Sequence, residues 1–199
     1  MSTLLSTKDR ILASAMQLLD SGGPGAVTLR AVGDATGISA AAPYRHYEDK
    51  RALIEAMVRA NLEYFNAALK KAKHEAQTPF AALDRLVRAY FDFASRFPVR
   101  YRFLLESSHE DSPLGTEVRQ TFAGVTALVR EAQAAGEISG GDPDQISALI
   151  FGAAYGMADM SQHGAAAVRP DRIVPEPAPN LAPLLLDLLS GAFSNGHAA

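Results

Sequence analysis

Apolar side chains recur every three or four residues along nearly the whole chain, and this spacing limits the fold more than any other feature of the sequence. Period-two runs of β-branched residues, which would indicate strands, are missing. We therefore predict an all-α fold of about nine helices. Two predicted core-facing stripes consist of Phe80, Leu83, Val87, Tyr90, Phe91, Ala94 and Phe97, and of Val118, Phe122, Val125, Val129 and Ala132.

Glycine and proline mark the expected ends of these helices. A first helix over residues 7–21 ends at Gly22-Gly23-Pro24-Gly25, and Phe97-Pro98 ends a later helix. Gly136 and the run Gly140-Gly141-Asp142-Pro143 end one helix and begin the next. Five prolines between residues 169 and 183 predict an extended loop, followed by a short, strongly apolar helix over 181–193.

Composition excludes several classes of protein. The 199 residues include no cysteine, which rules out disulfide scaffolds, thiolate metal sites and cysteine nucleophiles. No run is long and apolar enough to cross a membrane and the first residues lack a signal-peptide core, so we expect a cytoplasmic protein. The formal charge is −3, so an anionic partner must be met by a local basic patch. Residues 1–75 carry ten Lys and Arg against eight Asp and Glu, whereas residues 76–199 carry nine against fourteen.

Motifs of common enzyme classes are not found in the sequence. His109-Glu110 lacks the second histidine of a zinc-protease motif, and neither a nucleophile elbow nor a phosphate-binding loop occurs. Asp159 and His163 lie four residues apart on one expected helix face, but two ligands without a third more often form a surface hydrogen bond. We expect no catalytic residues, no metal and no cofactor.

Residues 28–47 carry the clearest functional pattern, that of two short helices joined by a tight turn. Thr28 is suited to cap the first helix, and Gly37 supplies a residue without a Cβ where the chain reverses. Ile38 provides an apolar plug, and Gly33 allows the helices to approach. With a second helix over 40–47, this is the arrangement of a helix-turn-helix, although the turn alone also fits a plain αα-corner.

A DNA-binding protein would place that second helix in the major groove. Three alanines begin it and can touch thymine methyl groups, which leaves Arg45 as the one strong candidate for reading bases. Tyr44 and His46 are suited to phosphate contacts, to which Lys50 and Thr28 can add. Tyr47 is assigned to the core.

The motifs Val32-Gly33-Asp34-Ala35-Thr36-Gly37-Ile38-Ser39, Pro43-Tyr44-Arg45-His46-Tyr47 and Asp49-Lys50-Arg51-Ala52-Leu53 together resemble the N-terminal signature of the TetR family of bacterial transcriptional regulators. The resemblance implies a three-helix DNA-binding head over residues 1–48 and a ligand-binding and dimerisation body over 49–199, which begins with a connecting helix over 49–76. It places backbone contacts on Thr28, Tyr44, His46 and Lys50, and base-facing positions on Ser39, Ala40, Ala41, Ala42 and Arg45. Thr36 departs from the family's usual alanine, and Pro43 makes the start of the recognition helix irregular.

Two recognition helices must be presented about 34–36 Å apart to enter adjacent major grooves, so DNA binding requires a dimer. We expect its surface from residues 146–163, with Gly152, Ala153, Ala154 and Gly156, and from residues 181–193. The alternative is that both segments complete the core of the monomer.

Aromatic residues on the central helices can line an apolar effector pocket or can be ordinary core. The candidates for ligand contact are Phe91, Tyr101, Phe103, Phe122, Phe151, Tyr155 and Asp159. The expected function is a homodimeric, sequence-specific regulator of transcription that a small apolar ligand releases from a near-palindromic operator. The alternative is a helical adaptor or small-molecule-binding protein without DNA binding.

Overall fold

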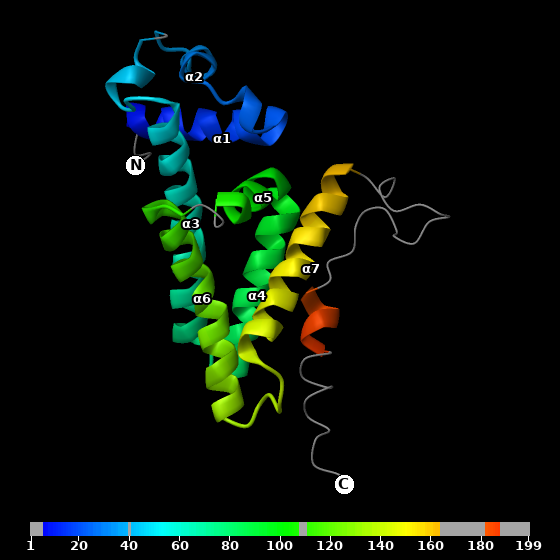
Figure 1. The fold of residues 1–199 in the computed structure, drawn as a ribbon. Coiled ribbons are helices and arrows are strands. Elements are labelled where there is room, and N and C mark those ends of the chain that lie inside the picture. The colour runs from blue at the N-terminus through cyan, green and yellow to red at the C-terminus, as the bar shows by residue number, and fades with distance from the viewer. Residues whose placement is uncertain (1–5, 40, 108–110, 164–181, 188–199) are drawn as a thin grey trace. The chain divides into compact units, whose positions relative to one another are not determined.

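The structure is a computed structural model that describes residues 6–39, 41–107, 111–163 and 182–187 (Figure 1). Within these residues every regular element is helical, which confirms the all-α prediction. The chain divides into two compact units, residues 1–62 and 63–199, and helix α3 (Lys50–Glu75) begins in the first and ends in the second. The domain boundary expected at residue 48 stays a prediction.

The first unit contains α1 (Thr7–Ala26), α2 (Leu29–Thr36), the 3-10 helix η1 (Pro43–Arg45) and the first half of α3. A capping box begins α1, because Ser6 Oγ accepts from Asp9 N and the Asp9 carboxylate accepts from Ser6 N, each at 3.2 Å. The helix is broken at Gly23, whose φ is 69°, close to the predicted end of the first helix. Ile11, Leu19, Val32 and Leu53 are fully buried and form the core of this unit.

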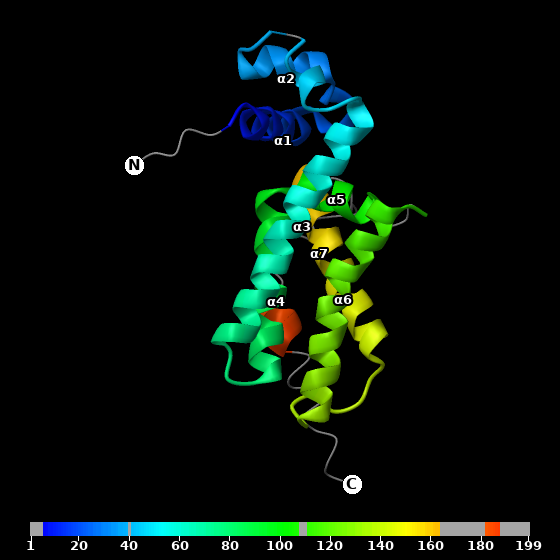
Figure 2. The same cartoon turned by 90° about the vertical axis from the view of Figure 1, so that its left-hand side faces the viewer.

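The second unit is built from the end of α3 and four further helices: α4 (Pro79–Arg96), α5 (Pro98–Ser107), α6 (Pro113–Ala134) and α7 (Pro143–His163). Each of these four helices begins with a proline, whose missing N–H is no loss in a first helical turn. Figures 1 and 2 show α4 beside α6 and α7, with the short α5 lying across one end of them. The apolar stripes predicted for residues 80–97 and 118–132 thus lie on α4 and α6, except for Phe97, which caps the end of α4, and most of their side chains are buried.

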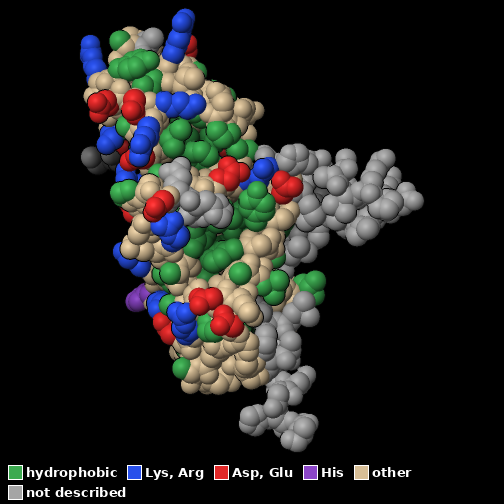
Figure 3. Space-filling model, in the orientation of Figure 1, with side chains coloured by type: hydrophobic (Ala, Val, Ile, Leu, Met, Phe, Trp, Pro, Cys, Tyr) green, Lys and Arg blue, Asp and Glu red, His purple; other side chains and the backbone are tan. Residues whose placement is uncertain are grey.

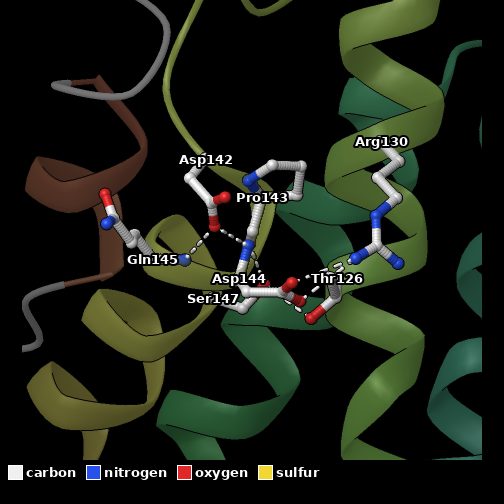
Figure 4. A network of polar contacts seen from close by, with 7 residues as sticks. All are labelled: Thr126, Arg130, Asp142, Pro143, Asp144, Gln145 and Ser147. Atoms are coloured by element: carbon white, nitrogen blue, oxygen red, sulfur yellow. Dashed lines mark hydrogen bonds and ion pairs between the residues drawn. The ribbon is translucent and has the colours of Figure 1, made fainter.

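A chain of hydroxyl groups joins α6 to α7 inside this unit (Figure 4). Thr126 Oγ1 donates to Ser147 Oγ at 2.9 Å, and Ser147 Oγ donates to the carbonyl of Pro143 at 2.8 Å. Both hydroxyl groups belong to buried residues. Nearer the solvent, Arg130 pairs with Asp144 at 3.1 Å. The start of α7 is therefore tied to α6 by polar contacts as well as by packing.

The C-terminal predictions fall mostly outside the described residues. Of the helix expected over 181–193, residues 182–187 are described and are helical. Of the loop expected over 169–183, residues 182 and 183 are described and belong to this helix, so the loop prediction is wrong there, and the other residues lie outside the described part of the chain. Helix α3 covers nearly the range expected for the connecting helix, 49–76, while its role as a connection between two domains stays a prediction. None of the helices in the described part of the chain is long and apolar enough to span a membrane.

Candidate functional site

The start of α2 is capped by Thr28, as the sequence predicts. Its hydroxyl accepts a hydrogen bond from Ala31 N at 3.1 Å, and the residue itself is exposed. A cap of this kind satisfies one of the backbone N–H groups left open at a helix N-terminus, and the remaining ones favour an anion there. Thr28 therefore stands at a helix end that suits a phosphate group.

The turn after α2 depends on Gly37, which adopts the left-handed conformation with φ 69° and ψ 29°. Its N–H bonds to Asp34 O and the next N–H, of Ile38, to Gly33 O, each at 3.2 Å. Arg10 of α1 also holds this helix end, because its Nη2 donates to Thr36 O at 3.0 Å. Arg10 could not be identified from the sequence, since nothing local indicates that residues 26 positions apart meet.

The segment after the turn differs from the helix expected over residues 40–47. The structure shows a single 3-10 turn, Pro43–Arg45, in which Arg45 N bonds to Ala42 O at 3.1 Å and His46 N to Pro43 O at 3.0 Å. Pro43 lacks the N–H that an α-helix would direct to Ser39 O, and Ala42 N takes that acceptor instead at 2.8 Å. Ala40 lies outside the described residues.

Most of the predicted contact residues on this turn face solvent. Tyr44 is 57% exposed, and Ser39, Ala41, Arg45 and His46 are also exposed, while Ala42 is half-buried. Tyr47 is 4% exposed, which confirms its assignment to the core, and burial together with Asp9 raises the pKa of its hydroxyl. One face of the turn therefore anchors it to the first unit while the other presents polar groups.

Lys50 is the first residue of α3, and its side chain reaches the kinked end of α1. Its Nζ donates to the carbonyl of Pro24 at 3.2 Å and remains exposed. Asp49 Oδ1 caps the helix by accepting from Ala52 N at 2.7 Å. An ammonium group bonded to one exposed carbonyl still has two donors for a further partner.

The seven residues predicted to contact an effector are distributed over α4, α5, α6 and α7. Phe122 and Phe151 meet edge to face at 5.0 Å between ring centroids. Asp159 pairs with Arg102 at 3.0 Å, and the Arg102 guanidinium lies 5.8 Å from the Tyr155 ring centroid. Phe91 and Tyr101 are fully buried, and Phe122 nearly so, whereas Phe103, Phe151, Tyr155 and Asp159 are half-buried.

Sequence reasoning missed the residue at the centre of this aromatic cluster. Phe65, on α3, lies 4.5 Å from Tyr90, 5.6 Å from Phe122 and 6.4 Å from Tyr101 between ring centroids. Burial raises the pKa of both Tyr90 and Tyr101 far above the ordinary value for tyrosine. The only available signal was the apolar spacing of α3, which does not show which helices its side chains meet.

No metal site emerges from the described residues, which hold no group of three or more His, Asp or Glu side chains placed around one point. Asp159, considered above as a ligand together with His163, has the Arg102 guanidinium as its partner.

Two family models match the chain. The model for bacterial regulatory proteins of the tetR family matches residues 11–57, and the model for the tetracyclin repressor-like C-terminal domain matches residues 83–176. Among curated proteins, the nucleoid occlusion factor SlmA of Marinobacter nauticus is 27% identical over 138 residues, covering 68% of this chain and 71% of the relative.

Solved structures of similar fold cover almost the whole chain. A protein of unknown function from Rhodococcus sp. RHA1 superposes with a TM-score of 0.72 at 25% identity, covering 100% of this chain and 98% of that one. The TetR family transcriptional regulator PfmR from Thermus thermophilus gives a TM-score of 0.70 at 22% identity, with 92% and 98% covered. These structures show that the helical arrangement recurs in other proteins.

Proposed function

The chain belongs to the TetR family of bacterial regulatory proteins and is a transcriptional regulator, and we propose that it acts as a dimeric repressor that a small apolar ligand releases from a near-palindromic operator. The observation that carries the proposal is the left-handed turn at Gly37. It joins the end of α2, whose start is capped by Thr28, to a turn whose Tyr44, Arg45 and His46 side chains face solvent.

On DNA, we assign Thr28, Tyr44, His46 and Lys50 to phosphate contacts and Arg45 to a base edge. The small side chains of residues 39–42 allow the backbone to approach the groove. Because η1 is a 3-10 turn, residues three apart are eclipsed, which places Arg45 in line with Ala42. We therefore expect direct readout to be concentrated on Arg45, with the alanines adding contacts to thymine methyl groups.

Exposed small and apolar residues on α7 support the dimer. Leu149 is 56% exposed, and a Cβ added at Gly152 or at Gly156 would meet no atom within 4 Å. The packing of the described protomer therefore does not require glycine at these positions, while a partner helix could approach closely there. Ala154 is different, because it is fully buried within the protomer and packs its core.

Release by a ligand requires that the second unit affect the first. Helix α3 is a continuous segment of 26 residues with ends in both units, about 39 Å long at 1.5 Å per residue. A ligand that binds one position of this helix better than another shifts the population by its difference in affinity. The aromatic cluster around Phe65, which belongs to α3, is where such a ligand would act.

Selection of bound sequences from a random duplex pool tests the proposal. We expect an enriched site with two-fold symmetry, half-sites about one helical turn apart, and an affinity that falls steeply with salt as counterions are released. Failure to enrich any duplex, or affinity indifferent to salt, would favour the helical adaptor. The proposal that a ligand releases the protein from DNA is contradicted separately if compounds that bind the protein leave its operator affinity unchanged.

A further inference from the structure

The hydroxyl group of Tyr101 is buried without a hydrogen-bond partner among the described residues. Tyr101 lies on α5, is 0% exposed, and its Oη makes no contact that satisfies the geometry of a hydrogen bond. Buried polar groups in folded proteins nearly always have a partner, because an unpaired one loses its bonds to water and gains nothing in return. This hydroxyl group therefore calls for an explanation.

A trapped water is a poor explanation for the unpaired hydroxyl group of Tyr101. A buried water typically makes two to four hydrogen bonds, so it needs several polar neighbours. The ring contact found for Tyr101 is with Phe65, and the titratable group that affects the pKa of its hydroxyl is Tyr90, which is itself uncharged near neutral pH. Phe65 is in turn surrounded by the rings of Tyr64, Tyr90, Phe93 and Phe122. These surroundings suit an apolar molecule better than a water.

The aromatic cluster leads from this hydroxyl group to the surface of the second unit. Phe65 connects Tyr101 to Phe122, at 6.4 Å and 5.6 Å between centroids, and Phe122 lies 5.0 Å from the half-buried Phe151 on α7. Figure 3 shows hydrophobic side chains at the surface between α6 and α4 on the face it displays. An apolar molecule inserted among these rings would have its inner end at Tyr101.

We propose that the effector is an uncharged, flat apolar molecule with one hydroxyl or carbonyl oxygen, and that this oxygen hydrogen-bonds to Tyr101 Oη. The proposal rests on the effector site proposed above and names the chemical class of its ligand. A tyrosine hydroxyl can donate and accept, so phenols, alcohols and ketones all qualify.

A carboxylate does not qualify, because a buried charge needs a counter-charge. Two arginines flank Tyr101 in the sequence. Arg100 lies over the Phe97 ring, and Arg102 pairs with Asp159 at 3.0 Å, although its Nε is buried without a partner among the described residues. Because Asp159 already balances the charge of Arg102, we expect neutral oxygen-bearing ligands to bind more tightly than carboxylic acids of the same shape.

Three aromatic probes of one size test this inference by isothermal titration of the full chain without DNA: 2-naphthol, 2-methylnaphthalene and 2-naphthoate. We expect wild-type protein to bind 2-naphthol about tenfold more tightly than 2-methylnaphthalene, the usual effect of one buried hydrogen bond. Binding of 2-naphthoate should be weaker still, because its charge would have to be buried. Tyr101→Phe should bind 2-naphthol and 2-methylnaphthalene equally.

Tyr47→Phe is the matched control, because Tyr47 Oη is the other buried tyrosine hydroxyl without a partner in the described residues, and it belongs to the first unit. It should keep the preference for 2-naphthol. Without ligand, Tyr101→Phe should melt at the wild-type temperature or about 2–4 °C above it, since it removes an unpaired group. A lower melting temperature would show that the hydroxyl group is already satisfied and would overturn the proposal.

Three further outcomes would overturn the proposal. They are equal affinity of the wild type for 2-naphthol and 2-methylnaphthalene, no binding of 2-naphthol, and a preference for 2-naphthol that survives in Tyr101→Phe. These outcomes leave DNA binding untouched. If the probes bind through Tyr101 but do not change operator affinity, the ligand class stands and the release mechanism fails.

Discussion

Gly124 on α6 lies so close to Leu69 on α3 that a Cβ added at Gly124 would come within 2.6 Å of Leu69 Cδ2. Both residues belong to the second unit, where Lys73 and Glu131 also join these helices by an exposed ion pair at 2.7 Å. Exposed pairs contribute little to stability, so the close packing at Gly124 is the stronger determinant of how α3 lies on α6.

Gly124→Ala should leave the free energy of unfolding in urea nearly unchanged, because the cost of displacing the end of the half-buried Leu69 side chain offsets the gain of about 1 kcal/mol from the better helix propensity of alanine. In a Leu69→Ala background the same substitution should instead stabilise the protein by up to about 1 kcal/mol, since the obstructing side chain is gone. Additive effects of the two substitutions would contradict the contact.

Gly37→Ala should destabilise the first unit by roughly 1–2 kcal/mol, the cost of a left-handed conformation for a residue with a Cβ. No atom lies within 4 Å of the added Cβ, so backbone strain is the whole effect. The matched control is Gly25→Ala, which also meets no atom within 4 Å and has no positive φ. Thermal unfolding should show a lower melting temperature for Gly37→Ala and no lower one for Gly25→Ala.

Lys50→Ala should weaken binding to all duplex sequences alike and reduce the slope of log affinity against log salt by about 1. Lys71→Ala removes the same charge from the same helix and is not expected to contact DNA, so it should keep the wild-type slope. Fluorescence anisotropy over a salt series measures both. Equal slopes in the two variants would remove Lys50 from the phosphate contacts.

Arg45→Ala should lose about 1–3 kcal/mol of operator affinity and relax the preference at one base position in each half-site. Tyr44→Ala should weaken binding without changing sequence preference, because a phosphate contact does not read bases. Repeating the duplex selection with each variant separates the two roles. An unchanged preference in Arg45→Ala would show that bases are read elsewhere.

Stability should fall as the pH rises above about 10, the ordinary pKa of tyrosine in an unfolded chain. Burial raises the pKa of Tyr90 and Tyr101 in the folded protein, so above pH 10 the unfolded chain releases protons that the folded protein keeps. Each of the two tyrosines then lowers the free energy of unfolding by up to about 1.4 kcal/mol per pH unit, until the pH reaches its pKa in the folded protein. Urea unfolding should show a shallower loss for Tyr101→Phe and a still shallower one when Tyr90→Phe is added.

Local chemistry made parts of the fold and site predictable. Thr28 and Gly37 were identified from the sequence because a helix cap and a left-handed turn each require a particular residue type. Pro43 was expected to disturb the recognition helix, but its effect is larger, leaving one 3-10 turn in place of a helix over 40–47.

Contacts between distant residues were not predictable in this way. Arg10 with Thr36 O, and Lys50 with Pro24 O, each join residues 26 positions apart through exposed or partly buried side chains that carry no local pattern. Phe65 was missed for a related reason. Its apolar character places it inside the protein, but only the packing of α3 against α4 and α6 makes it the centre of the rings.

The hydroxyl pair between Thr126 and Ser147 limits how α7 can move. A slide of α7 along α6 by one turn would separate the two hydroxyls and take from buried Thr126 its acceptor, whereas Ser147 would keep its bond to the Pro143 carbonyl within α7. A rotation that pivots on this pair would keep the bond intact. A ligand wedged among the rings at Phe151 would therefore swing the far end of α7 outward while its first turns stay in register with α6.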